Sequence, residues 1–149
     1  MMYSKKIKFI TIGLSLLLLL FSLSQNALIV NYGGETKTGA SFDYFFMGAI
    51  AFMGGGLFEE IIWLANPLCL YAIIYFWKND PKAISLSLLA SALAVSFSFW
   101  SEILGAESGA MAKIISFELG YYLWISSILI LTIGILVHYR MTLKGSLQS

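Results

Sequence analysis

The stretch GGGLFEEIIWLANP, residues 54–67, decides how this chain is divided. Three consecutive glycines interrupt a helix, because each glycine costs about 1 kcal/mol of helix stability relative to alanine. An apolar run follows them and carries Glu59 and Glu60 at its head. The stretch therefore predicts that one helix ends before Gly54 and that a second, strongly apolar helix begins near Leu57.

The composition of the whole chain indicates the environment of that helix. Of the 149 residues, 59% are apolar and only 11% are charged, whereas a soluble domain has about 25% charged residues. This is too little charge for a water-exposed surface, so we expect an integral membrane protein with the lipid bilayer around it. A helix of about 20 apolar residues crosses a bilayer core. Four runs reach or approach that length: 9–28, 61–77, 83–100 and 121–139.

The apolar segment before the glycines does not fit this scheme. Residues 45–58 are too few for a crossing, and joined to the run at 61–77 they would form a helix of roughly 50 Å, too long for a core of about 30 Å. Residues 41–53 are therefore predicted to form a short re-entrant or interfacial helix. In the second outer loop, helix formers from Ala110 onward predict an outward extension of the fourth helix. The predicted fold is an all-α, single-domain membrane bundle of four helices, with the short helix in the first outer loop.

The basic residues predict how the helices are oriented. Cytoplasmic loops of membrane proteins hold the excess of lysine and arginine, and most basic residues of this chain fall on one side of the predicted helices. We therefore expect a multi-pass protein of the inner (cytoplasmic) cell membrane, with both termini in the cytoplasm and loops 29–60 and 101–120 facing outward. An alternative stays open for the first run, because its basic start and the small residues before Gln25 also fit a cleaved signal peptide. The basic residues on the cytoplasmic side are Lys5, Lys6, Lys8, Lys78, Lys82, Arg140 and Lys144.

The composition disfavours several functional classes. A net charge of +1 gives no reason to expect nucleic acid as a partner. The chain has one cysteine, Cys69, and one histidine, His138, so it lacks the Cys/His cluster of a structural zinc site or a haem attachment motif. No catalytic residue, cofactor or metal site is predicted.

The apolar run that begins near Leu57 has one polar face. Glu59, Trp63 and Asn66 follow the spacing i, i+4, i+7, which places them on one side of a helix. Pro67 has no backbone N–H, so the carbonyl oxygen of Trp63 loses its helical partner. Polar faces of membrane helices point into the bundle or into a wet cavity. We interpret the face as a proline kink with an interhelical hydrogen bond or, alternatively, as a binding site for a ligand or an ion.

Acidic residues at the outer ends of the predicted helices extend this candidate site. Glu59 and Glu60 precede the second long helix, Glu102 follows the third, and Glu118 precedes the fourth. Four carboxylates at one membrane depth would attract cations. In the alternative interpretation, these acids only meet water at the helix ends, Glu59 and Glu60 stabilise the start of their helix, and Lys113 pairs with Glu118 or Glu107. The candidate polar or ligand site therefore comprises Glu59, Glu60, Trp63, Asn66, Glu102 and Glu118.

Small residues form seams on the third and fourth predicted helices. Small side chains let membrane helices approach closely, and their hydroxyl groups form interhelical hydrogen bonds of roughly 0.6 kcal/mol each. The seams predict close packing, either within the chain or against a partner. The seam residues are Ser87, Ser91, Ala94 and Ser98 on the third helix, and Ser127 and Gly134 on the fourth.

The segments WLANP (63–67) and LGYYLWISS (119–127) resemble a pattern found in small, uncharacterised multi-pass membrane proteins of bacteria. The resemblance implies a bacterial four-helix membrane protein. It brings no activity with it, and no functional residue is assigned from it.

Three functional classes are compatible with these features. The first is a non-catalytic accessory or assembly subunit, which packs through its small-residue seams against a membrane protein partner or against copies of itself in a homo-oligomer. The second is an oligomeric pathway for a small solute or an ion, entered through an acidic outer vestibule. The third, a membrane-embedded enzyme, is disfavoured because the sequence shows no nucleophile–base pair and no set of metal ligands.

Overall fold

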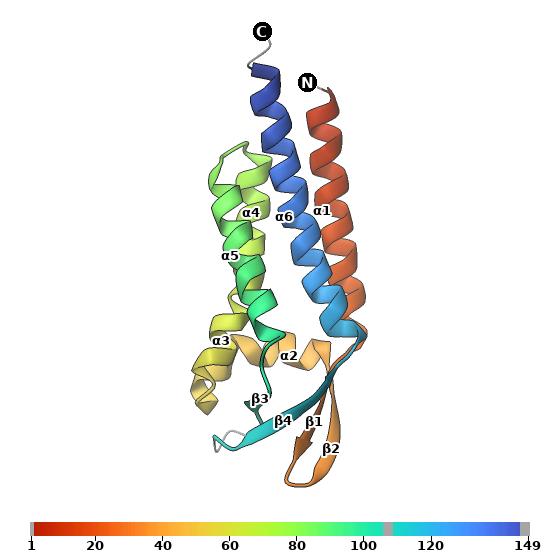
Figure 1. Cartoon of the computed structure of the whole chain (residues 1–149), viewed down its shortest axis with the longest axis vertical. Helices are drawn as coiled ribbons and strands as arrows, with labels where there is room; N and C mark the ends of the chain where they lie inside the picture. Colours follow the sequence, from red (N-terminus) through yellow and green to blue (C-terminus); the bar gives the residue numbers. More distant parts are fainter. Residues whose placement is uncertain (1, 106–108, 147–149) are drawn as a thin grey trace.

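The structure is a computed structural model that describes residues 2–105 and 109–146 (Figure 1). In chain order the elements are α1 (Met2–Leu23), β1 (Asn26–Tyr32), β2 (Glu35–Ala40), α2 (Ser41–Met47), the 3₁₀ helix η1 (Gly48–Gly54), α3 (Leu57–Trp63), α4 (Ala65–Trp77), α5 (Lys82–Phe97), β3 (Glu102–Leu104), β4 (Met111–Phe117) and α6 (Leu119–Ser146). The long helices stand side by side, and a small β-sheet lies at one end of them. The start of α1 and the end of α6 lie together at the opposite end.

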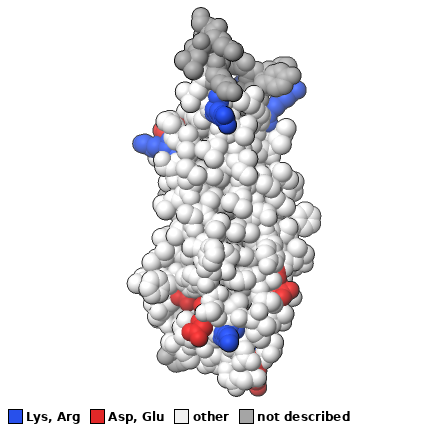
Figure 2. Space-filling model, in the orientation of Figure 1, with Lys and Arg blue, Asp and Glu red and all other residues white. Residues whose placement is uncertain are grey.

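Apolar helices form the long part of the molecule. Three helical stretches are long and apolar enough to cross a membrane: Lys5–Leu23, Leu57–Trp77 and Leu119–Leu143. α5 is also apolar but shorter, at 16 residues, and packs against α4 and α6. On the face shown in Figure 2, lysine and arginine gather near the end that holds the termini, acidic side chains gather mostly near the sheet, and the band between them carries no charge.

Small residues bring α6 into close contact with two other helices. The hydroxyl oxygens of Ser91 on α5 and Thr132 on α6 lie 2.8 Å apart, and Thr132 Oγ1 also lies 3.0 Å from the carbonyl oxygen of Ser87. Gly134 allows α1 to approach, because a Cβ built on this glycine would collide with Thr11. Most of the predicted seam is therefore used for packing within this chain.

Both loops that are predicted to face outward contribute to the sheet. Its strand order is β2–β1–β4–β3, and all neighbouring strands are antiparallel. The turn between β1 and β2 consists of Gly33 and Gly34, whose φ angles of 61° and 91° match the type I′ turn that suits two right-twisted strands. β1 then pairs with β4 from the second outer loop, with Leu28 opposite Phe117. The sheet thus joins segments that are far apart in the sequence.

This four-stranded antiparallel sheet shows that the predicted all-α four-helix fold is wrong. The first helix ends at Leu23, so that Ala27 and Leu28 belong to β1 and not to the run at 9–28. β4 occupies Met111–Phe117, the segment expected to extend the fourth helix. The physical reason is that β1 and β4 pair with each other across the two loops, and strand formation reflects such pairing more than the intrinsic preference of a segment.

A short helix crosses the end of the bundle next to the sheet (Figure 1). α2 continues directly into η1, and Gly55, with a φ of 89°, ends it. α3 then begins at Leu57, where the sequence predicts a helix start. Large apolar side chains of α2 and η1, among them Phe46 and Met53, are exposed. The crossing helix therefore has one face toward the protein and another that protein does not cover.

Candidate ligand-binding cavity

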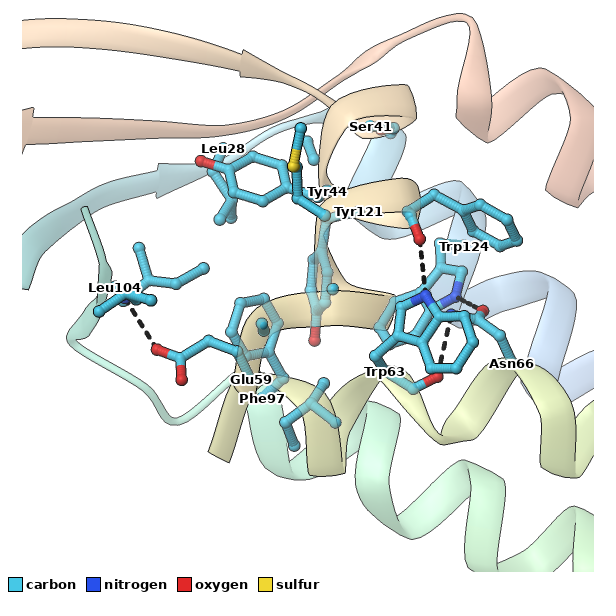
Figure 3. Close-up of a pocket in the computed structure, with 18 of the residues that line it drawn as sticks. Leu28, Ser41, Tyr44, Glu59, Trp63, Asn66, Phe97, Leu104, Tyr121 and Trp124 are labelled. Carbon is cyan, nitrogen blue, oxygen red and sulfur yellow. Dashed lines mark hydrogen bonds between the residues drawn. The ribbon is translucent and has the colours of Figure 1, made fainter. Parts of the chain in front are cut away.

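A cavity of about 640 Å³ lies where the bundle meets the sheet (Figure 3). All six α-helices, η1, β1 and β3 contribute residues to its lining. In the sequence, the first of these residues is Ser22 and the last is Trp124. Most lining residues are apolar, and only a few polar groups interrupt them. Cavities of roughly 300–1,000 Å³ with such a lining are typical of sites for small molecules.

The proline break between α3 and α4 creates the polar part of the cavity wall. Pro67 leaves the carbonyl oxygen of Trp63 without a helical donor, and Asn66 Nδ2 donates to that oxygen at 3.1 Å. Asn66 Oδ1 in turn accepts a hydrogen bond from Trp124 Nε1 at 2.8 Å. Trp63 Nε1 donates to the carbonyl oxygen of Phe45 at 2.6 Å. These bonds, drawn in Figure 3, tie α2, α3, α4 and α6 together around the cavity.

Glu59 lies at the edge of the cavity beside β3 (Figure 3). Its Oε1 accepts a hydrogen bond from the backbone N–H of Leu104 at 2.8 Å. Its Oε2 has no hydrogen-bond partner within residues 2–105 and 109–146, and no basic side chain there forms an ion pair with it. Among the described residues that line the cavity, Glu59 is the one with a formal charge. The cavity thus contains one carboxylate, held in position through one oxygen and available through the other.

Two serines line the cavity near the start of α6. Ser22 Oγ donates to the carbonyl oxygen of Gly120 at 2.8 Å. Ser41 has only 7% of its surface exposed, and its Oγ has no partner in the described part of the chain. A buried hydroxyl without a partner costs about 1–3 kcal/mol, so a polar ligand atom that bonded to Ser41 would recover this free energy. Among the described residues, the hydroxyl oxygen of Tyr139 is the other buried side-chain oxygen without a hydrogen-bond partner, and it does not line the cavity.

Aromatic rings form much of the remaining wall. Phe97 on α5 and Tyr121 on α6 pack edge to face, with ring centroids 5.7 Å apart. Tyr44 on α2 packs against Gly39, where a Cβ would collide with the tyrosine ring. Burial raises the pKa of the Tyr44 hydroxyl, and the nearby carboxylate of Asp43 raises it further. Tyr44 therefore stays neutral at physiological pH and contributes no charge to the wall.

The structure brings three of the six predicted site residues to this cavity. Glu59, Trp63 and Asn66 line it together, as expected for residues on one helix face. Trp63 and Asn66 use their polar groups for the hydrogen bonds that shape the wall. Of the three, only Glu59 offers an atom without a partner among the described residues.

The other predicted acids lie elsewhere. Glu102 shares with Glu59 a smaller hollow of about 310 Å³ that adjoins β3. Glu60 and Glu118 line neither space, and Glu118 Oε1 accepts a hydrogen bond from Ser116 Oγ at 2.6 Å. Within the described ranges, no group of three or more His, Cys, Asp or Glu side chains is placed to hold a metal ion.

Most lining residues were not among the predicted site residues, and Trp124, Ser41 and Tyr44 are three of these. Trp124 had a usable signal, since an asparagine inside an apolar helix needs a donor from a neighbouring helix. Ser41 and Tyr44 had none, because their place in the wall depends on α2 folding back across the end of the bundle.

Because the comparisons with known proteins found no match, a proposal about function has to rest on the cavity. No family model, curated protein or solved structure matches this chain. The resemblance of residues 63–67 and 119–127 to small bacterial membrane proteins stays a prediction.

Proposed function

We propose that this chain is a multi-pass membrane protein that binds one elongated apolar molecule, such as a single lipid chain, in the cavity between bundle and sheet. The observation that carries the proposal is the cavity itself, about 640 Å³ in volume and lined mainly by apolar and aromatic side chains. A few fixed polar groups in an apolar wall orient a ligand, while the apolar surface supplies most of the binding free energy.

We infer that the cavity lies at the outer end of the membrane-spanning helices. We infer that α5 crosses the membrane together with the three longer helices, because it packs alongside α4 and α6. The side that holds the termini carries most of the basic residues, so we assign it to the cytoplasm of a bacterial cell. The sheet and the cavity would then lie at the outer surface of the inner membrane.

Exposed apolar side chains near the cavity support entry from the lipid phase. Phe46, Met47, Ile50 and Met53 on α2 and η1 are all more than half exposed. Three of them, Met47, Ile50 and Met53, also line the cavity. A surface that is apolar and continuous with an apolar cavity is favourable in contact with lipid and unfavourable in water.

The sequence also allows a subunit role or a solute pathway. The structure does not test these two alternatives, but its packing bears on both. Most of the small-residue seam is buried between helices of this chain, so a subunit partner would mainly need another surface, and the subunit hypothesis stays a prediction. A solute pathway would have to continue from Asn66 toward the cytoplasm. There the fully buried side chains of Phe76, Leu131 and Ile135 fill the bundle, and this observation does not favour a pathway.

Quenching of tryptophan fluorescence tests the proposal in detergent or in lipid nanodiscs. The probe is a single-chain alcohol with a nitroxide near its middle, which quenches nearby indole rings. Trp63 and Trp124 line the cavity, and we expect saturable quenching in the wild-type protein.

Ala51→Phe narrows the cavity and should weaken binding by at least about tenfold. Ala92→Phe, the same change on the exposed surface of α5, is the matched control and should bind as wild type. Unsaturable quenching of the wild type, or unchanged binding by folded Ala51→Phe, would overturn the proposal.

A further inference from the structure

We propose that the ligand of this cavity is an amphiphile with a cationic, ammonium-type headgroup, which Glu59 recognises. The inference rests on the proposed function, because it assigns a chemical class to the molecule bound in the same cavity. Glu59 lines both the large apolar cavity and the smaller hollow of about 310 Å³ beside it. One side chain thus stands where an apolar space meets a second, more polar one.

The two spaces differ in the ligand group that they favour. The described lining residues of the large cavity carry no charge apart from Glu59, so this space suits a hydrocarbon chain. The smaller hollow is lined by two carboxylates, Glu59 and Glu102, and by no lysine or arginine in the described part of the chain. Lys113 lies opposite Glu102 where β3 pairs with β4, but among the described residues it forms no ion pair with Glu102. Two carboxylates without an ion-pair partner favour a cation and disfavour a phosphate or carboxylate headgroup.

The geometry of Glu59 suits such recognition. The hydrogen bond from Leu104 N–H to Oε1 holds the carboxylate in one orientation, while Oε2 has no partner among the described residues. A carboxylate that is already oriented loses little conformational freedom on binding, which increases the affinity that each contact contributes. Trp100 and Phe58 also line the smaller hollow, and aromatic faces attract ammonium groups.

A second observation points to a polar ligand atom in the large cavity. The Ser41 hydroxyl lines this cavity, is more than nine-tenths buried and has no partner in the ranges that the structure describes. An acceptor such as an ester or amide carbonyl near the start of the ligand's chain would satisfy it. Glu59 and Ser41 together describe an amphiphile with an ammonium group in the smaller hollow and a hydrogen-bonding group within the larger cavity.

The test compares two nitroxide-labelled probes of equal chain length, an alkylamine and the corresponding alcohol. In the wild-type protein we expect the amine to bind about tenfold more tightly, as for a hydrogen bond to a charged group. Glu59→Gln keeps an oxygen for the Leu104 N–H but removes the charge, so the amine and the alcohol should then bind equally tightly. Glu60→Gln, the same change at an acid that lines neither space, should keep the preference.

The outcomes separate the inference from the proposed function. Equal binding of amine and alcohol to the wild type, or a preference that survives Glu59→Gln, would overturn the inference while the cavity stays a lipid-chain site. Failure of both probes to bind the wild type would instead overturn the proposed function. If Glu59→Gln does not fold, Glu102→Gln changes the other carboxylate of the hollow and should reduce the preference by a factor of about three; an unchanged preference there counts against the inference.

Discussion

The bundle near the termini and the junction beneath the sheet are built from similarly apolar residues, but they pack differently. In the bundle, Phe76, Leu131 and Ile135 are completely buried and contact each other across helices. At the junction, helices, a 3₁₀ helix and strands surround a cavity of about 640 Å³. Helices that run side by side can interdigitate their side chains, whereas the crossing helix α2–η1 meets the bundle and the sheet at steep angles (Figure 1).

The comparison teaches that different interactions hold the two regions. The bundle relies on close packing and on a few hydrogen bonds, such as those of Thr132 with α5 and the one from Lys8 Nζ to Asn79 Oδ1 at 2.6 Å. The junction relies on directed bonds between elements, among them the bond of Trp124 to Asn66, and on close approach at glycines such as Gly120. Substitutions should therefore act through lost packing in the bundle and through lost bonds or collisions at the junction.

The largest effect is expected in the bundle, from Phe76→Ala. Removing a fully buried phenylalanine side chain typically costs about 3–5 kcal/mol of folding free energy, and the ring of Phe76 also packs edge to face on His138 at 5.1 Å. Unfolding in mixed micelles with increasing SDS measures the change. Phe42→Ala, at a position 53% exposed, should cost less than about 1 kcal/mol. Equal losses for the two variants would show that close packing does not distinguish the bundle.

A smaller effect is expected at the junction, from Gly120→Ala. The added Cβ would meet Ser41 Oγ and the backbone oxygen of Asn26 at 2.6 Å, and such overpacking costs about 1–3 kcal/mol. Gly13→Ala makes the same change in α1, where nothing lies within 4 Å of the new Cβ, and should raise stability by up to about 1 kcal/mol because alanine is the better helix former. The same unfolding measurement applies, and a neutral Gly120→Ala would show that the contact between α2 and α6 is loose.

The smallest of these effects is expected from the hydrogen bonds of Asn66. Asn66→Leu leaves the Trp124 N–H and the Trp63 carbonyl oxygen without partners, a loss of about 1–2 kcal/mol. Trp124→Phe removes the donor of the same bond together with part of the indole ring, and it leaves Asn66 Nδ2 bonded to the Trp63 carbonyl oxygen. In a double-mutant cycle the second change should add little to the first, because both remove the same bond. Strictly additive losses would mean that the bond between Asn66 and Trp124 does not stabilise the junction.

The candidate site was partly predictable from the sequence. The spacing of Glu59, Trp63 and Asn66 placed them on one face, and all three line the cavity. The expected ring of four acids does not form around it, because Glu60 and Glu118 line neither the cavity nor the hollow. The position of an acid at a helix end indicates its depth along the bundle, but its direction depends on how the helix is rotated and on what covers its end.

By itself, the sequence determined the features that depend on local composition. The apolar runs, the glycine break before Leu57 and the uneven distribution of lysine between the two ends are properties of contiguous segments, and helices satisfy their hydrogen bonds within such segments. Only the tertiary structure decided the rest. β1 exists as a strand of this sheet because β4 lies beside it, and the cavity exists because α2 and η1 fold back between that sheet and the bundle. The pairing of β1 with β4 and the cavity require partners from distant parts of the chain, and no single segment specifies them.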